Sequence, residues 1–457
     1  MTYDVAIIGA GASGVLVAAH LHRREPSLRV AIVDAGARAA RGLAYGTPYG
    51  AHLLNVPAAR MSAFIDDADD FTKWLAAKAG RATGREFAPR ALYGEYLAEV
   101  LGRACEPPST TARVFGTAVG LTRTDGGPWH LHLQDGRIAE AHVAILALGN
   151  LAPSDPLRLG DRVPDNYLRD PWAPGSAHGL AADAPVVIIG SGLTMVDVVL
   201  ALRAEGHRGT IHAISRHGLL PFGHAAHLPR TIGLPAAKSP RAALRWIREE
   251  ARTAAKDGAD WRAVMDALRP MTQSIWQSWT GADRAAFMRH LRAYWDIHRH
   301  RAAPEVAAEV AALIDDGTLT VHAGRITALR EAGDQLAVDC VLRHSGAART
   351  FLAARVINCT GPASDYSSLD LPLVAQLRRS GWLVADPLRL GVETDADGRL
   401  LGADGEAVPG LFTIGPLRRP ALWESTAIPE IRAQAAALAE LLPSEVARRE
   451  SGRGWRA

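Results

Sequence analysis

The sequence predicts an α/β protein with two Rossmann-like, three-layer dinucleotide-binding domains, the second inserted in the first, and an additional helical subdomain. Three observations predict this fold. An apolar strand runs into a glycine-rich turn and a helix at the N-terminus, the pattern recurs near residue 186, and similar strands follow each copy. The expected first domain covers 1–155 and 365–457, and the second covers 156–364, with the helical insertion at about 238–313.

The first glycine-rich turn follows a short apolar strand, Val5 to Ile8, and opens a helix that extends to about Arg24. The turn residues expected to hold a dinucleotide are Gly9, Gly11, Ser13 and Gly14. The first glycine permits the tight turn, the second lets the backbone approach a pyrophosphate, and the third lets the helix pack closely on the strand. The pyrophosphate would lie at the helix N-terminus, where N–H groups and the helix dipole favour an anion.

An acidic residue ends the next strand of this unit. The strand covers Arg29 to Val33, and Asp34 follows it. A carboxylate at this point is placed to accept a hydrogen bond from a ribose 2′-hydroxyl. Because strand, glycine turn, helix, strand and acid occur in this order, the pattern favours an FAD site over a glycine turn in an unrelated α/β fold.

The second unit begins with a strand, Val186 to Ile189, and a helix that extends to about Glu205. The turn residues expected to contact its dinucleotide are Gly190, Gly192 and Thr194. Met195 stands where the third glycine is expected, so this helix should pack less closely on its strand.

The second unit also differs at the end of its next strand. The expected strand covers Thr210 to Ser215, and Arg216 follows it. No acid stands at its end. A hydroxyl and a guanidinium can bind a 2′-phosphate, which an acid would repel. We interpret this end as an NADPH site, the alternative being that Arg216 is a solvated surface residue.

Matching strands follow the two units. After the first come "ARVFGTAVGLTRT", "WHLHLQDG" and "HVAILALGN", the last ending at Gly149. After the second come "LTVHAGRITALRE", "QLAVDCVLRH" and "ARVINCTGP", the last ending at Gly361. This duplication predicts that each domain adds a small antiparallel excursion to its parallel sheet.

The composition argues against several classes of protein. Hydrophobic residues make up 48% of the chain, charged residues make up 22%, and the net charge is +3 without a basic block, so neither a nucleic acid nor a membrane surface is an expected partner. The cysteines Cys105, Cys340 and Cys359 form no C-x-x-C pair, which argues against a zinc site and a redox-active disulfide. Without a signal peptide or an apolar run long enough to span a membrane, a soluble cytoplasmic protein is expected.

The insertion has four helical patterns, with expected starts at Ser239, Asp260, Asp283 and Ala303-Pro304. Its tryptophans either fill a helical core or cover a substrate cleft. The run "HRHR", His298 to Arg301, either binds a carboxylate or the NADPH phosphate, or forms a solvated helix face. His224 and His227 are three residues apart without a nearby acid, so no metal site is expected.

Several long stretches carry a family resemblance: "GLAYGTPYGAHLLNVPAARMSAF", "APRALYGEYL", "GSGLTMVDVVLAL", "ISRHGLLP", "YWDIHRHRAAPEVA", "NCTGP" and "LFTIGPLRRPALWESTAIPEIRAQA". With them the chain resembles a bacterial family of FAD/NAD(P)-binding proteins, two-dinucleotide-binding-domain flavoproteins related to flavin-dependent N-hydroxylating monooxygenases. The resemblance implies FAD in the first domain and NADPH in the second.

The resemblance also implies roles for single residues. The loop from Arg41 to Phe64 would run along the flavin and supply Arg41, His52, Asn55 and Met61. Asn55 is the candidate polar group near the reactive edge of the flavin, although an Asn before Val-Pro is also typical of a turn.

The C-terminal part of the chain would close the FAD site. In the family an Asp follows the glycine at Gly415, whereas this sequence has Pro416, so a ribityl contact would come from elsewhere. The stretch from Trp423 to Thr426, including Glu424, would open a helix whose N-terminus points at the flavin, or would simply precede a capped helix with a buried face.

These observations favour an NADPH-dependent FAD monooxygenase that acts through a C4a-hydroperoxyflavin and uses molecular oxygen on a small substrate, most simply at an amine nitrogen. A reductase that passes electrons to a quinone or protein is the second hypothesis. The third is a non-catalytic sensor of redox state, which stays open because Pro416 and Met195 depart from the usual cofactor-binding residues. The sequence leaves the substrate and the oligomeric state open.

Overall fold

The computed structural model describes residues 2–36, 40–107, 109–124, 126–160, 163–235 and 237–450. They divide into two compact units. Unit 1 comprises 1–48, 56–150 and 364–457, and unit 2 comprises 49–55 and 151–363. The last seven residues of the expected range 365–457 lie outside the described residues.

Unit 1 contains a mainly parallel sheet. Its elements are β1 (Thr2–Ile8), α1 (Ala12–Arg24), β2 (Val30–Asp34), α2 (Gly42–Tyr45), α3 (Asp70–Ala79), α4 (Arg90–Cys105), β3 (Ala112–Phe115), β4 (Ala118–Arg123), β5 (Trp129–Leu133), β6 (Ile138–Leu146), α12 (Pro372–Arg379), β14 (Arg399–Leu401), β15 (Ala407–Thr413), α13 (Arg419–Leu422) and α14 (Ile428–Glu450). The strand order is β14-β15-β6-β1-β2-β3, and β5 extends the sheet antiparallel from β6 to β4.

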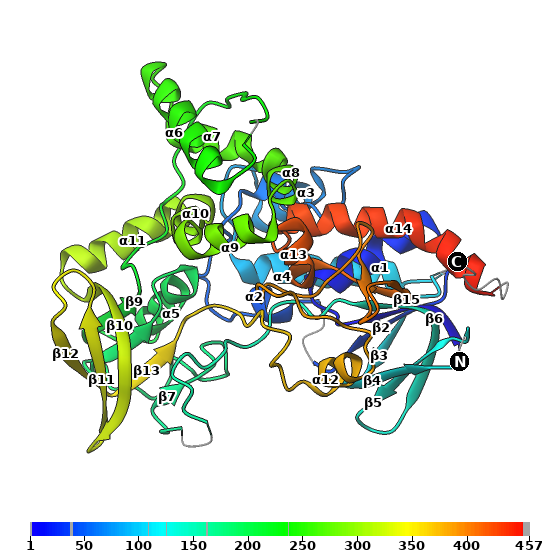
Figure 1. The fold of residues 1–457 in the computed structure, drawn as a ribbon, viewed down its shortest axis with the longest axis horizontal. Helices are drawn as coiled ribbons and strands as arrows, with labels where there is room; N and C mark the ends of the chain where they lie inside the picture. Colours follow the sequence, from blue (N-terminus) through cyan, green and yellow to red (C-terminus); the bar gives the residue numbers. More distant parts are fainter. Residues whose placement is uncertain are drawn as a thin grey trace. The chain divides into compact units, whose positions relative to one another are not determined.

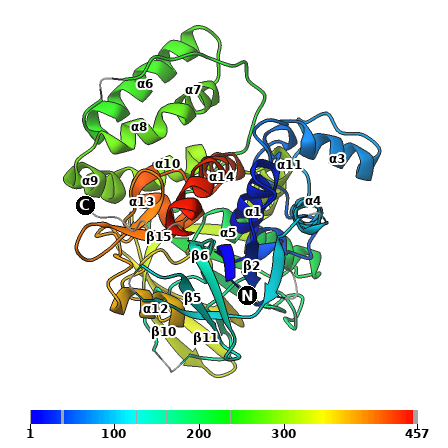
Figure 2. The ribbon, with the colours of Figure 1, turned by 90° about the vertical axis from the view of Figure 1, so that its right-hand side faces the viewer.

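Unit 1 has three layers (Figures 1 and 2). Helix α1 packs against α4 and α14 on one face of the sheet, and α12 packs against β4 on the other. The central strands are apolar on both sides because helices or strands cover both faces of the sheet. In β1, for example, Val5 to Ile8 are all buried. The carboxyl ends of β1 and β2 carry the first glycine turn and Asp34.

Unit 2 repeats this plan. Its elements are β7 (Tyr167–Leu168), β8 (Val186–Ile189), α5 (Leu193–Ala204), β9 (Ile211–Ser215), α6 (Pro240–Lys256), α7 (Trp261–Leu268), α8 (Thr272–Gln277), α9 (Gly281–His290), α10 (Arg292–Arg299), α11 (Pro304–Asp315), β10 (Leu319–Ala332), β11 (Gln335–Leu342), β12 (Ala348–Ala353) and β13 (Arg355–Asn358). The strand order is β12-β11-β10-β9-β8-β13-β7, parallel from β10 to β7 and antiparallel from β10 to β12. Helices α6 to α8 lie away from this sheet (Figures 1 and 2).

The predicted α/β class with two parallel-containing sheets is confirmed. The predicted duplication holds as well, because β10 and β11 follow the second unit as β4 and β5 follow the first. The short strands β7, β12 and β14 were not predicted, since each is brief or lies at a sheet edge. Strands β6 and β13 also end three residues before Gly149 and Gly361, at Leu146 and Asn358.

The predicted helices of the insertion need correction. Ser239 and Asp260 do cap α6 and α7, accepting hydrogen bonds from the N–H groups of Ala242 and Arg262. Asp283 is not a helix start, because Thr280 caps α9 and Asp283 completes a capping box as its third residue.

Two of the four predicted helical patterns are interrupted. One breaks at the 3₁₀ turn Arg269–Met271, which contains Pro270, and the other breaks between α9 and α10 at Leu291. The C-terminal helix likewise does not open at Trp423. Trp423 has a φ of 60°, and α14 begins at Ile428.

Candidate cofactor and substrate sites

The first glycine turn is a cradle in which side chains would collide with backbone. Gly9 has a φ of +109°, and a Cβ there would lie 2.4 Å from the carbonyl oxygen of Ala147. A Cβ on Gly14 would lie 1.9 Å from the carbonyl oxygen of Gly9, so α1 packs directly on the turn. A Cβ on Gly11 would meet only the Cα of Gly42, at 3.8 Å. The turn is therefore closed toward the sheet and approachable at Gly11, which fits a pyrophosphate at the N-terminus of α1.

The residues flanking this cradle come from three parts of unit 1. Ser13, in the first turn of α1, is buried against Gly415, whose φ is +79°. A Cβ on Gly415 would lie 2.7 Å from Ser13 Oγ. The N–H of Gly415 donates to Gln434 Oε1 at 3.0 Å. Pro416, which replaces the expected acid, is the second residue of the 3₁₀ turn Gly415–Arg418.

Asp34 lies at the carboxyl end of β2, half-buried. Burial raises the pKa of its carboxyl group, while the backbone N–H groups of Gly36 and Ala35 act in the opposite direction. Its position next to the cradle is the one that a ribose-binding carboxylate requires.

Buried polar atoms without partners lie near the start of α14. The hydroxyl of Ser425, which is fully buried, and Nε2 of Gln434 have no hydrogen-bond partner among the described residues. Buried polar groups are normally paired, so both atoms fit contact with a bound polar group. Glu424 is half-buried and Thr426 is exposed, and both lie in the turn before α14, not in the helix. Ser425 and Gln434 both lie in the stretch "LFTIGPLRRPALWESTAIPEIRAQA" that carries the resemblance, but the sequence does not single either of them out as a ligand.

The loop predicted to run along the flavin divides between the units. Arg41 directly precedes α2 in unit 1, and Met61 is buried in unit 1. Tyr49–Asn55, however, packs with unit 2, although it lies within the range 1–155. His52 is buried and its Nε2 lies 2.8 Å from the carbonyl oxygen of Asp197 in α5.

Asn55 is fixed through its backbone. Its carbonyl oxygen lies 3.1 Å from Nε2 of His224. Burial, followed by the charge of Arg301, lowers the pKa of His224 to about 4. His224 is therefore neutral at neutral pH and donates from Nε2, which leaves Nδ1 unprotonated.

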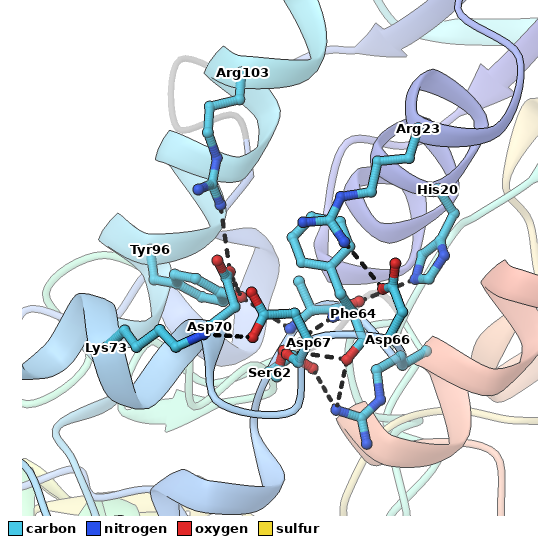
Figure 3. A network of polar contacts seen from close by, with 12 residues as sticks. His20, Arg23, Ser62, Phe64, Asp66, Asp67, Asp70, Lys73, Tyr96 and Arg103 are labelled. Carbon is cyan, nitrogen blue, oxygen red and sulfur yellow. Dashed lines mark hydrogen bonds and ion pairs between the residues drawn. The ribbon is translucent and has the colours of Figure 1, made fainter.

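A network of polar contacts fixes the turn that ends this loop in unit 1 (Figure 3). The N–H of Ala63 donates to the Tyr96 hydroxyl at 2.9 Å, and that hydroxyl donates to Asp70 Oδ2 at 2.5 Å. His20 Nε2 lies 3.0 Å from the carbonyl oxygen of Ala63. Arg432 of α14 donates to the carbonyl oxygen of Ser62 at 2.9 Å. Helices α1, α3, α4 and α14 thus hold one short segment.

Charged side chains extend this network. The guanidinium of Arg23 lies 3.2 Å from the centroid of the Phe64 ring and pairs with Asp66 at 3.0 Å (Figure 3). Lys73 pairs with Asp67 at 2.9 Å. These pairs are exposed and contribute little each, so the buried hydrogen bonds at Ala63 carry more of the stabilisation.

The second glycine turn has the same backbone geometry as the first. Gly190 has a φ of +116°, and a Cβ there would lie 2.4 Å from the carbonyl oxygen of Cys359. A Cβ on Gly192 would meet nothing within 4 Å. Thr194 is half-buried in α5, and Met195 is fully buried where Gly14 stands in the first unit.

The end of β9 gathers basic groups. Ser215 Oγ accepts from the N–H of Gly218 at 3.0 Å and lies 2.8 Å from Ser191 Oγ, so it also shapes the turn. Arg216 is exposed, and its carbonyl oxygen accepts from Arg343 Nη1 at 3.2 Å. Arg343, which follows β11, was missed because only the pairing of β9, β10 and β11 brings it here. A guanidinium suits a phosphate, and Arg343 places one beside the backbone of Arg216.

Gly149 and Gly361 follow β6 and β13 in equivalent places. Their φ angles are +64° and +88°, and a Cβ on either would meet nothing within 4 Å. Both glycines therefore serve backbone conformation and leave space beside the chain.

The described residues hold no cluster of three or more potential metal ligands. His227 Nε2 instead lies 3.2 Å from Asp266 Oδ2, and His224 binds the Asn55 carbonyl. Cys105, Cys340 and Cys359 are free, and Cys340 and Cys359 are buried. Every helix in the described ranges is too short or too polar to cross a lipid bilayer.

Two glycine cradles on sheets whose central parallel strands correspond, β6-β1-β2-β3 and β13-β8-β9-β10, are typical of the two-dinucleotide-binding-domain class of flavoprotein folds. Residues 6–151 match the model of a family described as FAD-NAD(P)-binding. No curated protein sequence matches the chain.

Within that class, the fold is similar to that of N-hydroxylating monooxygenases. Ornithine hydroxylase from Pseudomonas aeruginosa aligns with a TM-score of 0.66 and 13% identity, over 97% of this chain and 100% of that chain. Ornithine N-hydroxylase from Kutzneria sp. 744 aligns with 0.68 and 14%, over 98% and 100%. L-lysine 6-monooxygenase from Pseudomonas syringae aligns with 0.69 and 17%, over 97% and 99%. The resemblance drawn from the sequence is confirmed at the level of fold.

Proposed function

We propose that this protein is an NADPH-dependent, FAD-containing monooxygenase that transfers one oxygen atom of O₂ to an amine nitrogen of a small molecule. The observation that carries the proposal is a pair of glycine cradles with matching backbone geometry in a chain that shares its fold with N-hydroxylating monooxygenases over nearly its full length. The solved Kutzneria enzyme contains reduced FAD, NADP⁺ and L-ornithine.

The first domain, 1–155 with 365–457, is proposed to hold FAD. The cradle Gly9, Gly11 and Gly14 would receive the pyrophosphate, with Ser13 beside it. Asp34 would accept from the ribose, and Arg41, Gly149, Gly415, Glu424 and Thr426 complete the proposed set. Ser425 and Gln434 offer the polar contacts that Pro416 cannot provide. Bound flavin supplies the electron transfer and oxygen activation that amino-acid side chains lack.

The second domain, 156–364 with its insertion at 238–313, is proposed to hold NADPH. Gly190, Gly192 and Thr194 would line the pyrophosphate, and Gly361 would leave room beside it. Ser215 and Arg216 would bind the 2′-phosphate, with Arg343 as a second guanidinium. No acid ends β9 to repel that phosphate.

Asn55 is proposed as the polar residue nearest the reacting atoms. Its backbone is held by neutral His224, which donates a hydrogen bond without carrying a titratable proton at neutral pH. This contact fixes the backbone of Asn55 and brings no acidic proton to it, which suits oxygen transfer.

The deciding experiment is rapid mixing of the NADPH-reduced protein with oxygen, followed by absorbance. A monooxygenase shows a transient, distinct from oxidised and reduced flavin, that decays faster with a substrate amine. Immediate reoxidation with release of peroxide would instead favour a reductase. Failure to bind flavin, or flavin that NADPH cannot reduce, would favour the redox sensor.

A further inference from the structure

Four oxidisable aromatic side chains form a row in unit 1 that the proposed chemistry does not use. The row consists of Tyr45 in α2, Tyr93 and Tyr96 in α4, and Trp74 in α3. The ring centroids of successive members are 4.7, 5.5 and 5.7 Å apart. The ring of Phe71 packs beside the row, with its centroid 5.0 Å from those of both Tyr93 and Tyr96. Each ring is therefore within contact distance of the next.

The inner end of the row lies close to the first glycine cradle. Helix α2 begins at Gly42, and a Cβ on Gly42 would lie 3.3 Å from the Cα of Gly11. Tyr45 ends this four-residue helix, so it is one helical turn from the proposed FAD pyrophosphate. The two tyrosines of α4 are fully buried, and Trp74 at the other end is half-buried. The row thus leads from the cofactor cradle through the core of unit 1 toward the surface.

Two of the four rings donate a hydrogen bond to a carboxylate. The Tyr96 hydroxyl donates to Asp70 Oδ2 at 2.5 Å (Figure 3), and Trp74 Nε1 donates to Glu99 Oε2 at 2.7 Å. A phenol or indole that loses an electron becomes a strong acid, and a carboxylate already bonded to it takes the proton, so no unpaired positive charge stays in the core. The Tyr93 hydroxyl has no partner among the described residues. Tyr96 and Trp74 are therefore the places where a radical can rest, and the ring of Tyr93 can only pass an electron on.

We propose that this row conducts electrons from Trp74 to the FAD site and so removes one-electron oxidants that form there. The oxidants are hydroxyl or hydroperoxyl radicals, derived from oxygen that is reduced at the cofactor but not transferred to a substrate. The radical takes one electron from the row and becomes hydroxide or hydroperoxide anion. The vacancy moves to Tyr96 and then to Trp74, and the proton of the oxidised ring passes to its carboxylate. A thiol or ascorbate in solution then supplies one electron, and the carboxylate returns the proton.

This inference rests on the proposed function for the source of the oxidant. The row itself, with its two carboxylate partners, lies entirely within unit 1.

One substitution separates conduction from packing. Tyr93→Phe keeps the buried ring and removes a hydroxyl that has no partner among the described residues, so it should not lower stability. Phenylalanine is much harder to oxidise than tyrosine, so the row is broken at its second ring. Trp382→Phe is the control for the loss of a tryptophan. Like Trp74, Trp382 is half-buried in unit 1, but its ring packs 5.0 Å from that of Trp129, outside the row.

The first measurement needs no cofactor. Azide radicals produced by pulse radiolysis oxidise accessible tryptophans of the full-length protein, and absorbance follows the transfer of the vacancy from tryptophan to tyrosine. The expected result is a tyrosyl radical that grows as a tryptophanyl radical decays, at a rate independent of protein concentration. Trp74→Phe and Tyr96→Phe should each lose most of this component, and Trp382→Phe should retain it. An undiminished component in Trp74→Phe, or an equal loss in Trp382→Phe, would overturn the proposal.

The second measurement tests the end of the row at the cofactor. Blue light makes FAD in the loaded protein a one-electron oxidant, and electron paramagnetic resonance of frozen samples identifies the oxidised ring. Wild type should form a tryptophan radical that Trp74→Phe lacks. Tyr93→Phe should also lose this radical, while unfolding at the same or a higher denaturant concentration than wild type. An equal radical yield in Tyr93→Phe and wild type would overturn the proposed route.

Failure of the proposed function would look different from failure of the row. A protein that holds no FAD, or that forms no oxygen-dependent transient, would still show the transfer from tryptophan to tyrosine under azide radicals.

Discussion

At the scale of single residues, Gly14 has no room for a side chain. An added Cβ would lie 1.9 Å from the Gly9 carbonyl oxygen, so Gly14→Ala must push α1 off the turn. We expect unfolding free energy to fall by about 1–3 kcal/mol and bound flavin to decrease. Thermal unfolding and the ratio of flavin to protein absorbance measure both effects. Gly102→Ala in α4 is the control: its Cβ would meet nothing within 4 Å, and it should stabilise the helix. Equal behaviour of the two variants would contradict the packing argument.

A second residue-scale prediction concerns the choice between NADPH and NADH. Arg216→Ser should lower kcat/KM for NADPH by about tenfold or more, because a charge-assisted hydrogen bond to the 2′-phosphate is lost, and should leave NADH unaffected. Steady-state NAD(P)H oxidation measures this. Arg325→Ala, an exposed arginine of β10, is the matched control and should change neither value. If Arg216→Ser impairs both cofactors equally, Arg216 does not read the 2′-phosphate.

At the scale of elements, helix α4 carries a matched pair of tyrosines, one of which belongs to the hydrogen-bond network around Ala63. Tyr96 and Tyr93 are both fully buried, but the Tyr96 hydroxyl bonds Ala63 and Asp70, whereas the Tyr93 hydroxyl has no partner among the described residues. Tyr96→Phe should therefore cost about 1–3 kcal/mol of unfolding free energy, and Tyr93→Phe should be neutral or stabilising. Denaturant unfolding measures both. A similar loss in the two variants would show that the hydroxyl contacts do not stabilise this segment.

The elements also show where sequence reasoning succeeds. Both strand-turn-helix units were predictable because apolar runs end on glycines whose backbone conformations other residues avoid: Gly9 and Gly190 adopt φ angles of +109° and +116°. The helix starts in the insertion were harder to predict. Thr280 and Asp283 are both good cap residues, and only the capping box shows that Thr280 caps α9. The contact of His224 with Asn55 joins residues 169 positions apart, and no local pattern encodes it.

At the scale of the whole molecule, several histidines with lowered pKa values make stability depend on pH, and in two of them the lowering is large. Burial is the largest cause that lowers the pKa of His224 and of His322 to about 4, from 6.5 in an unfolded chain. Between these values the unfolded state binds more protons, so stability is complete above about pH 6.5 and falls as the pH drops toward 4. Each histidine adds at most about 1.4 kcal/mol per pH unit to the slope of the unfolding free energy against pH.

Urea unfolding at pH 7.5, 6 and 5 tests this dependence. His322→Gln removes one of the two groups and should flatten the decline of unfolding free energy between pH 6 and 5. A decline as steep as in wild type would show that His322 does not contribute.

The assignment of Tyr49–Asn55 to unit 2 means that the chain crosses between the units four times, at 48/49, 55/56, 150/151 and 363/364. A fragment of residues 151–363 would thus lack a native part of its own unit, including the segment that binds Asp197 and His224 through His52 and Asn55. Gene fusions or truncations that exchange one cofactor domain as a cassette would cut through this shared segment. Grafting the second unit onto another flavoprotein therefore requires carrying Tyr49–Asn55 along with it.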